Sequence, residues 1–221
     1  MTTRRVKCLV TAMVLAAGAG RRLGGESKVW RLFRGRPLWW HAASAFSGAV
    51  DAVVLVLAPD RMTEARSWLE DFPVPWELAA GGEERWQSTA AGMAKVTGEF
   101  VAIHDGARPL VPPDLIRRTL KAAHTTGAAI PAIPVSDTVK LVRDGMVERT
   151  LPRSRTMLAQ TPQVFRSDWI RRALVEQGGP VTDDASWVEA LGYPVAVVAG
   201  DPQNRKITTP DDWEWLERQE R

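Results

Sequence analysis

The sequence predicts an α/β protein with a mostly parallel, Rossmann-like sheet flanked by helices. Short apolar runs typical of buried strands alternate along the chain with longer segments typical of helices. A glycine-rich stretch directly follows the first of these runs, and ligands of parallel sheets collect where strands end. The 221 residues contain no internal repeat, low-complexity tract or linker, so we expect one domain spanning residues 1–221.

Composition and charge narrow the classes of function. The net charge is only +3 and the basic residues are scattered, which argues against nucleic-acid binding. The single cysteine, Cys8, cannot form an internal disulfide, and the first apolar run is too short for a signal peptide or a membrane span. We therefore expect a cytoplasmic protein without a nucleic-acid or membrane partner. We interpret the ten tryptophans as packing residues.

The glycine-rich stretch at residues 10–28 reads VTAMVLAAGAGRRLGGESK. Its small residues and cations are Ala16, Ala17, Gly18, Arg21, Arg22 and Lys28. Backbone N–H groups exposed by glycine attract anions, and adjacent cations indicate a polyphosphate. The stretch lacks the third glycine of a dinucleotide-binding loop and the Gly-Lys-Ser/Thr of a phosphate-loop NTPase. A glycine-rich strand exit with solvated arginines is the alternative.

The remaining elements follow from periodicity and from the residues that bound them. Pro37 and Gly48 bound the first helix, and Pro113 and Gly127 bound a later one. The predicted helices cover 38–46, 61–70, 89–93 and 113–124, with others beginning at 167 and 210 and one around Glu189. The predicted strands cover 52–57, 74–78, 99–103, 128–135 and 195–198.

Two loops that leave strands carry candidate ligands. Gly82 and Ser88 lie where a base or sugar could approach the backbone, although a glycine turn and a helix cap would look the same. Asp105 follows the strand at 99–103, where a carboxylate beside a phosphate loop is the usual ligand for magnesium. Arg108 could clamp a second phosphate, or it could form a local ion pair with Asp105.

A hairpin is the clearest local signal of the chain. Residues 138–143 and 146–151 flank the pair Asp144-Gly145, which favours a two-residue turn. A lone hairpin is marginally stable, so its apolar positions need a partner surface. We expect an arm at about residues 136–155 that grips a second copy in a two-fold dimer. The alternative is an arm folded back on its own domain.

Two later clusters are ambiguous by themselves. Thr182 and Asp183 lie in the sequence TDDAS just before a helix, where either residue could serve as the N-cap. Lys206 follows the last predicted strand, and a lysine in that place is weak support for a phosphate site.

Seven motifs in order resemble the 2-C-methyl-D-erythritol 4-phosphate cytidylyltransferase family, nearly from end to end. They are AAGAGRR, GG followed by S, HDGARP, VSDTVK, AQTPQVF, TDDAS, and NRKIT with TPDD. The resemblance implies a glycosyltransferase-A-like fold and a homodimer built by the hairpin arm. It also implies magnesium-dependent transfer of CMP from CTP to a polyol phosphate, with release of pyrophosphate, in non-mevalonate isoprenoid synthesis.

The resemblance also implies a role for each matching residue. CTP would be bound by Ala16, Ala17, Gly18, Gly82, Ser88 and Asp105. Arg22, Lys28 and Lys206 would surround the triphosphate and the reacting phosphorus. Asp105, Arg108, Thr138, Arg153, Thr161 and Thr182 would hold methylerythritol phosphate, and Asp105 would also serve magnesium. Thr138 and Arg153 lie on or just beyond the arm, so they would reach the neighbour's site.

Three departures from the family pattern accompany the resemblance. Ser27 precedes Lys28 where the family has proline, in a shorter loop, Glu83 replaces an aspartate, and Asp184 replaces a glutamate. The related activity on ribitol 5-phosphate remains open, as does a non-catalytic nucleotide-binding protein. A dehydrogenase is disfavoured by the missing third glycine. No covalent nucleophile is required, so Cys8 and the three histidines are not needed as catalysts.

Overall fold

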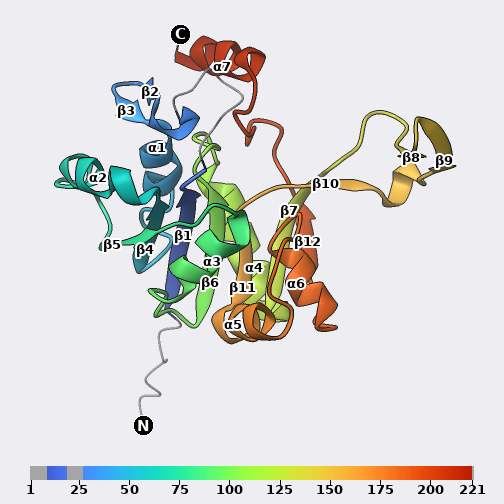
Figure 1. Cartoon of the computed structure of the whole chain (residues 1–221), viewed down its shortest axis with the longest axis horizontal. Helices are drawn as coiled ribbons and strands as arrows, with labels where there is room; N and C mark the ends of the chain where they lie inside the picture. The colour runs from blue at the N-terminus through green and yellow to red at the C-terminus, as the bar shows by residue number, and fades with distance from the viewer. Residues whose placement is uncertain (1–8, 19–26, 221) are drawn as a thin grey trace.

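The computed structural model describes residues 9–18 and 27–220, and it has a central sheet covered by helices on both faces (Figure 1). The fold class predicted from the sequence is confirmed. Cys8, Arg21 and Arg22, which the sequence analysis singled out, lie outside the described residues.

Eight strands of the described chain form the sheet. In spatial order they are β5 (Trp76–Ala80), β4 (Ala52–Leu57), β1 (Val10–Ala16), β6 (Phe100–Asp105), β11 (Gln163–Arg166) and β7 (Ala128–Pro134), with β10 (Met157–Ala159) and β12 (Ala196–Ala199) also paired with β7. Ala129 pairs with both Val164 of β11 and Ala196 of β12, so these two strands lie on opposite sides of β7.

Strand direction is parallel throughout this sheet except in one segment. The pairs β1–β4, β1–β6, β4–β5 and β7–β12 are parallel, whereas β10 and β11 run antiparallel to their neighbours. Neither β10 nor β11 was predicted from the sequence. β10 is only three residues long, and the segment AQTPQVF, which leads into β11, contains a proline and only two consecutive large apolar residues, Val164 and Phe165. As a consequence of the reversed direction, residues that precede β11 lie at the same edge as the carboxyl end of β6.

Alternating side chains of the strands point to opposite faces of the sheet and pack in two apolar layers. Val14 and its neighbours at even spacing pack under α1 (Leu38–Ser44), α2 (Met62–Trp68) and α4 (Pro113–Thr126). Met13 and its neighbours pack under α3 (Arg85–Met93), α5 (Ser167–Glu176) and α6 (Ala185–Ala190). The two-residue period of the strands thus explains why both faces are covered, as in Figure 1.

A smaller cluster joins the C-terminal helix to a short ribbon. α7 (Pro210–Glu217) packs Trp213 and Leu216 against Phe33 and Leu38. Its N-cap Thr209 accepts a hydrogen bond from the backbone N–H of Asp212 at 3.2 Å. The ribbon consists of β2 (Leu32–Phe33) and β3 (Arg36–Pro37), and the 3₁₀ turns are η2 (Lys28–Trp30), η3 (Pro59–Arg61), η4 (Arg153–Arg155) and η5 (Arg218–Glu220).

Several predicted boundaries differ from the structure by one or more residues, and two of the differences have a local cause. The helix expected at 89–93 begins at Arg85, because Glu84 and Gln87 form a reciprocal capping box that nucleates the helix four residues earlier. Ser88 is therefore a helical residue. The strand expected at 74–78 is β5 at Trp76–Ala80, shifted by the register of its pairing with β4.

The predicted hairpin is confirmed and stands apart from the sheet (Figure 1). Within the described chain, β8 (Lys140–Arg143) and β9 (Met146–Thr150) pair only with each other, around a turn in which Asp144 and Gly145 have φ of 51° and 77°. Every residue of both strands is exposed, including Met146 at 73%. The strands are not packed against their own domain, so the folded-back alternative does not describe this chain.

Burial also bears on two other expectations. Trp187 and Trp213 are buried, and Trp68 and Trp215 pack against apolar clusters, which confirms a packing role for these tryptophans. Within residues 9–18 and 27–220, no helix is long and apolar enough to cross a membrane.

His104 locks the end of β6 to the segment before β11. Its Nδ1 lies 2.9 Å from Thr161 Oγ1, and its Nε2 lies 3.2 Å from the carbonyl oxygen of Arg108. A neutral ring with its proton on Nε2 satisfies both contacts. Burial lowers the pKa of His104 to about 4, although the nearby Asp105 carboxylate opposes that change.

The lowered pKa of His104 predicts a pH-dependent stability. The unfolded chain takes up a proton near the ordinary histidine pKa, whereas the folded chain takes it up only near pH 4, so stability is lost as the pH falls through this window. We expect His104 to lower the free energy of unfolding by about 2 kcal/mol between about pH 6.5 and about pH 4.5. Urea titrations of wild type and His104→Gln across this range measure the difference, and equal pH slopes would contradict the prediction.

Candidate active site

The predicted site residues gather at one edge of the sheet. The carboxyl ends of β1, β5, β6 and β12 meet there, and the antiparallel β11 begins there. Ligands of α/β sheets collect at such an edge.

The loop after β1 is closed by a hydrogen bond between its two ends. The hydroxyl of Ser27 donates to the carbonyl oxygen of Gly18 at 2.9 Å. Proline could not make this bond, so the departure from the family pattern at Ser27 has a structural use. Lys28 follows at once and begins η2, whose Val29 and Trp30 are buried. The residue before Lys28 is thereby tied to Gly18, whereas Arg22 lies outside the described residues.

The predicted nucleotide-binding residues come together at the ends of β1 and β5. A Cβ atom on Gly81 would lie 2.2 Å from Cβ of Ala17 and 2.9 Å from Oγ of Ser88, so only glycine permits this approach. The backbone N–H of Gly82 donates to Ser88 Oγ at 3.2 Å. Ala16 is buried, whereas Gly18 and Gly82 are exposed at this edge.

Three cations converge on the carboxylate of Asp105. Nη1 of Arg85 lies 3.1 Å from Oδ1, Nζ of Lys206 lies 3.0 Å from Oδ2, and Nε of Arg108 lies 3.4 Å from Oδ2. They come from the start of α3, from the loop after β12 and from the loop after β6. The local Asp105–Arg108 ion pair weighed from the sequence exists, but it is one contact of a larger cluster.

Electrostatics keep Asp105 ionised. Burial would raise the pKa of its carboxyl group, but Arg85, Lys206 and Arg108 outweigh burial and hold the pKa well below its usual range. Burial lowers the pKa of Arg108, and the nearby carboxylate of Asp105 opposes this change only in part. The edge therefore presents one negative group surrounded by positive ones, an arrangement suited to anionic ligands.

The backbone behind the cluster is held by buried polar groups. Thr161 is buried, and its Oγ1 accepts a hydrogen bond from the backbone N–H of Asp105 at 3.1 Å. The same hydroxyl donates to Nδ1 of His104. The amide of Asn204 donates to the carbonyl oxygen of Thr161 at 2.7 Å, and Arg108 donates to the carbonyl oxygen of Asn204 at 2.7 Å. The hydroxyl of Thr161 thus has two partners inside the protein.

The sequence analysis missed the roles of four residues in this network. Arg85 bridges Asp105 and Asp184, Thr89 donates to Asp184 at 3.0 Å, and Asn204 links two loops. The available signals were an arginine three residues after Gly82 and an aspartate inside TDDAS. Burial would lower the pKa of Arg85, but its two carboxylate partners outweigh burial and raise it.

Three predicted acceptor residues lie apart from the cluster. Thr182 is exposed on the loop before α6, and the side chain of its neighbour Asp183 accepts the backbone N–H of Ser186, as a cap does. Arg153 donates to the carbonyl oxygen of Ser136 at the base of the hairpin, and Thr138 is exposed. Among the hydrogen bonds and ion pairs of residues 9–18 and 27–220, none joins Thr138, Arg153 or Thr182 to Asp105.

Among the described side chains there is no group of three acidic, histidine or cysteine residues that could hold a metal ion by itself. Asp105 has carboxylate oxygens at this edge of the sheet, and magnesium in nucleotide enzymes commonly takes one or two carboxylates while phosphates supply other ligands. A single carboxylate such as that of Asp105 is compatible with a magnesium ion whose other ligands are phosphate oxygens.

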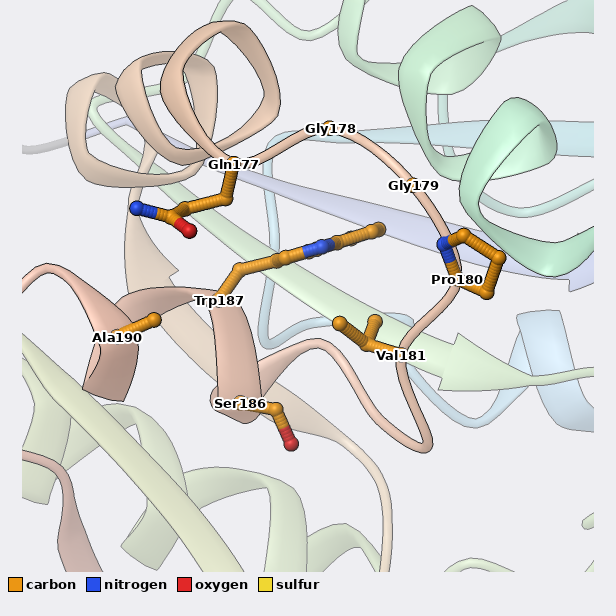
Figure 2. A pocket seen from close by; sticks show the side chains of 8 residues that line it. All are labelled: Gln177, Gly178, Gly179, Pro180, Val181, Ser186, Trp187 and Ala190. Atoms are coloured by element: carbon orange, nitrogen blue, oxygen red, sulfur yellow. The ribbon is translucent and has the colours of Figure 1, made fainter.

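Two cavities of the described chain lie away from this edge of the sheet. One of about 220 Å³ lies between α5 and α6, beside the indole of Trp187 (Figure 2). Another of about 410 Å³ lies beside His124, Arg166 and Trp169, near the start of β6. Neither of these two cavities is lined by a predicted site residue.

Comparison with known proteins agrees with the motifs. The family model described as 2-C-methyl-D-erythritol 4-phosphate cytidylyltransferase matches residues 10–218. The chain is 41% identical over 209 residues to the protein of that name from Dehalococcoides mccartyi strain CBDB1, covering 92% of each chain. It is 43% identical over 215 residues to the one from Pelotomaculum thermopropionicum, covering 92% of this chain and 90% of the other.

Solved structures give the same result. The 4-diphosphocytidyl-2C-methyl-D-erythritol synthase of Anaerococcus prevotii superposes with a TM-score of 0.83 at 28% identity, covering 96% of this chain and 97% of the other. The 2-C-methyl-D-erythritol 4-phosphate cytidylyltransferase of Thermus thermophilus gives a TM-score of 0.77 at 33% identity, covering 96% and 98%. The chain therefore belongs to the 2-C-methyl-D-erythritol 4-phosphate cytidylyltransferase family.

Proposed function

We propose that this chain transfers the cytidylyl group of CTP to 2-C-methyl-D-erythritol 4-phosphate, forming 4-diphosphocytidyl-2-C-methyl-D-erythritol and pyrophosphate. The observation that carries the proposal is the convergence of Arg85, Arg108 and Lys206 on Asp105, beside the loop of Gly82 and Ser88. The relatives named for this activity match the chain over nearly its whole length.

The reaction is a displacement at phosphorus. An oxygen of the acceptor's phosphate forms a bond to the α-phosphorus of CTP, while the bond from that phosphorus to the bridging oxygen breaks. Pyrophosphate leaves with the electron pair of the broken bond. Both reactants are anionic, so catalysis depends on positioning them and on neutralising the charge that builds on the equatorial oxygens.

Cations at the sheet edge supply that neutralisation. The side chain of Lys206 is 44% exposed although its ammonium contacts Asp105, so it can turn toward an entering phosphate. Lys28 directly follows Ser27, whose hydroxyl binds the carbonyl oxygen of Gly18, and it would face the triphosphate from there. Arg22 completes the proposed set on the ground of family resemblance.

Recognition of the two substrates divides along the edge. CTP would lie against Ala16, Ala17, Gly18, Gly82 and Ser88, where small residues permit close approach. The acceptor would lie near Asp105 and Arg108, with Thr161 holding the backbone of Asp105 from behind. Thr182 stands exposed on an adjoining loop and would contact the acceptor from there.

Magnesium would accompany the triphosphate. When bound, it neutralises phosphate charge and polarises the oxygens on phosphorus. Asp105 would hold it, since this carboxylate is ionised and lies beside Lys206 at the sheet edge. Lys206 would release Oδ2 of Asp105 as it turned toward phosphate.

We further propose that the chain is cytoplasmic and that the hairpin builds a homodimer. Its strands expose Leu141, Val142, Met146 and Val147, an apolar surface that two-fold pairing would cover. Thr138 and Arg153 lie at its base, so pairing would carry them to a neighbour's acceptor site.

The acceptor itself is the first prediction of the proposed function. We expect CTP with methylerythritol phosphate to yield pyrophosphate, and ribitol 5-phosphate to be a poor acceptor, because the family motifs belong to the former. A coupled pyrophosphate assay over a panel of polyol phosphates measures this. Comparable turnover of both acceptors would contradict the assignment of methylerythritol phosphate as the acceptor.

The lysines give a second prediction. Lys28→Ala or Lys206→Ala should lower kcat by roughly two to three decades while KM for CTP changes far less, because a cation facing the reacting phosphorus gains strength as charge builds. Lys95→Ala is the control, since Lys95 pairs with Glu77 on the surface. A rise in KM for CTP alone would make these lysines ordinary binders.

A shared active site is the third prediction. Arg153→Ala and Lys28→Ala proteins, each nearly inactive, are mixed and allowed to exchange subunits. If Arg153 serves the neighbour's site, one site of each mixed dimer collects both lesions and the other collects neither. Activity should then recover toward half of wild type per mixed dimer.

Exchange must be followed independently, with a different affinity tag on each variant. A mixture that demonstrably exchanges subunits but stays inactive would rule out sharing, because every site would then carry a lesion.

A further inference from the structure

Arg85 is the part of the cluster that connects two carboxylates. Its Nη1 binds Oδ1 of Asp105 at 3.1 Å, and its Nη2 binds Oδ2 of Asp184. Arg85 begins α3, Asp105 ends β6 and Asp184 precedes α6, so one guanidinium joins three elements. The planar fork of arginine suits such a double contact, which a single ammonium cannot make.

Asp184 is a fixed anchor for this arginine. Its side chain is 0% exposed, and its second oxygen accepts the hydroxyl of Thr89 at 3.0 Å. Burial raises the pKa of Asp184, and the charge of Arg85 opposes that rise. Arg85 thus binds one oxygen of a buried carboxylate whose other oxygen is held by Thr89.

The two oxygens of Asp105 are held differently. Arg85 binds Oδ1, whereas Lys206 and Arg108 both bind Oδ2. Lys206 must leave Oδ2 if it is to face a phosphate, and the 3.4 Å contact of Arg108 is the longest of the three. The contact at Oδ1 is then what prevents the carboxylate from rotating.

We propose that Arg85, anchored by Asp184, is a positioning residue that fixes the orientation of Asp105 while Lys206 exchanges this carboxylate for phosphate oxygens. The inference rests on the proposed function and deepens it. Because Arg85 lies three residues after Gly82, the same side chain ties the loop proposed to bind the base to the carboxylate proposed to serve the acceptor.

The first test separates positioning from stability. Arg85→Met should lower kcat ten- to a hundredfold, on the order of the cost of a misplaced catalytic group, with KM for CTP nearly unchanged. It should also lower Tm, because Asp184 loses its buried cation. The double variant Arg85→Met/Asp184→Asn removes the unpaired buried charge at position 184. The amide oxygen of the substituted side chain can still accept the hydroxyl of Thr89. Tm should therefore recover, whereas kcat should stay low.

Recovery of kcat together with Tm in the double variant would overturn the proposal, since Arg85 would then be merely structural. Arg85→Lys should remain slow because it keeps the charge without the fork, and a wild-type rate there would also overturn it. Arg172→Met is the matched control. Arg172 pairs with Glu176 at 2.6 Å on the surface, so this variant should match wild type in kcat and Tm.

A double-mutant cycle with Asp105→Asn tests whether Arg85 affects kcat through the Asp105 carboxylate. If Arg85 acts through Asp105, adding Arg85→Met to Asp105→Asn should slow the enzyme by no more than about twofold further. Losses that multiply would overturn the proposal.

A readout without turnover distinguishes this inference from the proposed function. In a crystal structure of the ligand-free Lys206→Ala/Arg85→Met/Asp184→Asn protein, where no lysine holds Oδ2, the Asp105 carboxylate should be rotated or spread over two conformers, whereas Lys206→Ala alone should keep its orientation. A carboxylate equally fixed in both variants would overturn the inference. Failure of wild type to release pyrophosphate from CTP would instead overturn the proposed function.

Discussion

The ionised carboxylate of Asp105 is the group on which the rest of this edge depends. A buried carboxylate without partners would cost several kcal/mol, and the chain avoids this by bringing three cations to it from three separate segments. The same carboxylate keeps those cations together when no substrate is present. An entering phosphate can then take over a cation without any new charge having to be assembled.

The topology explains how residues far apart in sequence meet at that carboxylate. Four parallel strands deliver their following loops to one edge, which is the ordinary behaviour of α/β sheets. The reversed direction of β11 adds a loop that precedes a strand, and this loop carries Thr161. His104 and Asn204 then hold that loop against the strand that ends in Asp105. The fold and the site are therefore stabilised by the same buried contacts.

Much of this could be predicted from the sequence because it depends on local patterns. Apolar runs with glycine and proline at their ends placed most strands and helices, and the Asp144-Gly145 pair located the hairpin. Asp105 stood out as a carboxylate at a strand end. By contrast, β11 is short and carries few strand-forming residues, so its pairing is decided by neighbours distant in the chain. The link from Arg85 to Asp184 spans 99 positions, and no spacing rule reveals such a contact. The early start of α3 depended on a capping box that a search for apolar periodicity overlooks.

The most direct measurement of the central claim is a crystal structure of the protein with CTP and magnesium. The account predicts cytosine beside Gly82 and Ser88, a triphosphate that reaches Lys28 and Lys206, and an ammonium of Lys206 that has moved from Asp105 to phosphate oxygen. Arg85 should remain on both carboxylates. CTP bound elsewhere, for example against Trp187 between α5 and α6, with the Asp105–Lys206 contact intact, would contradict the account.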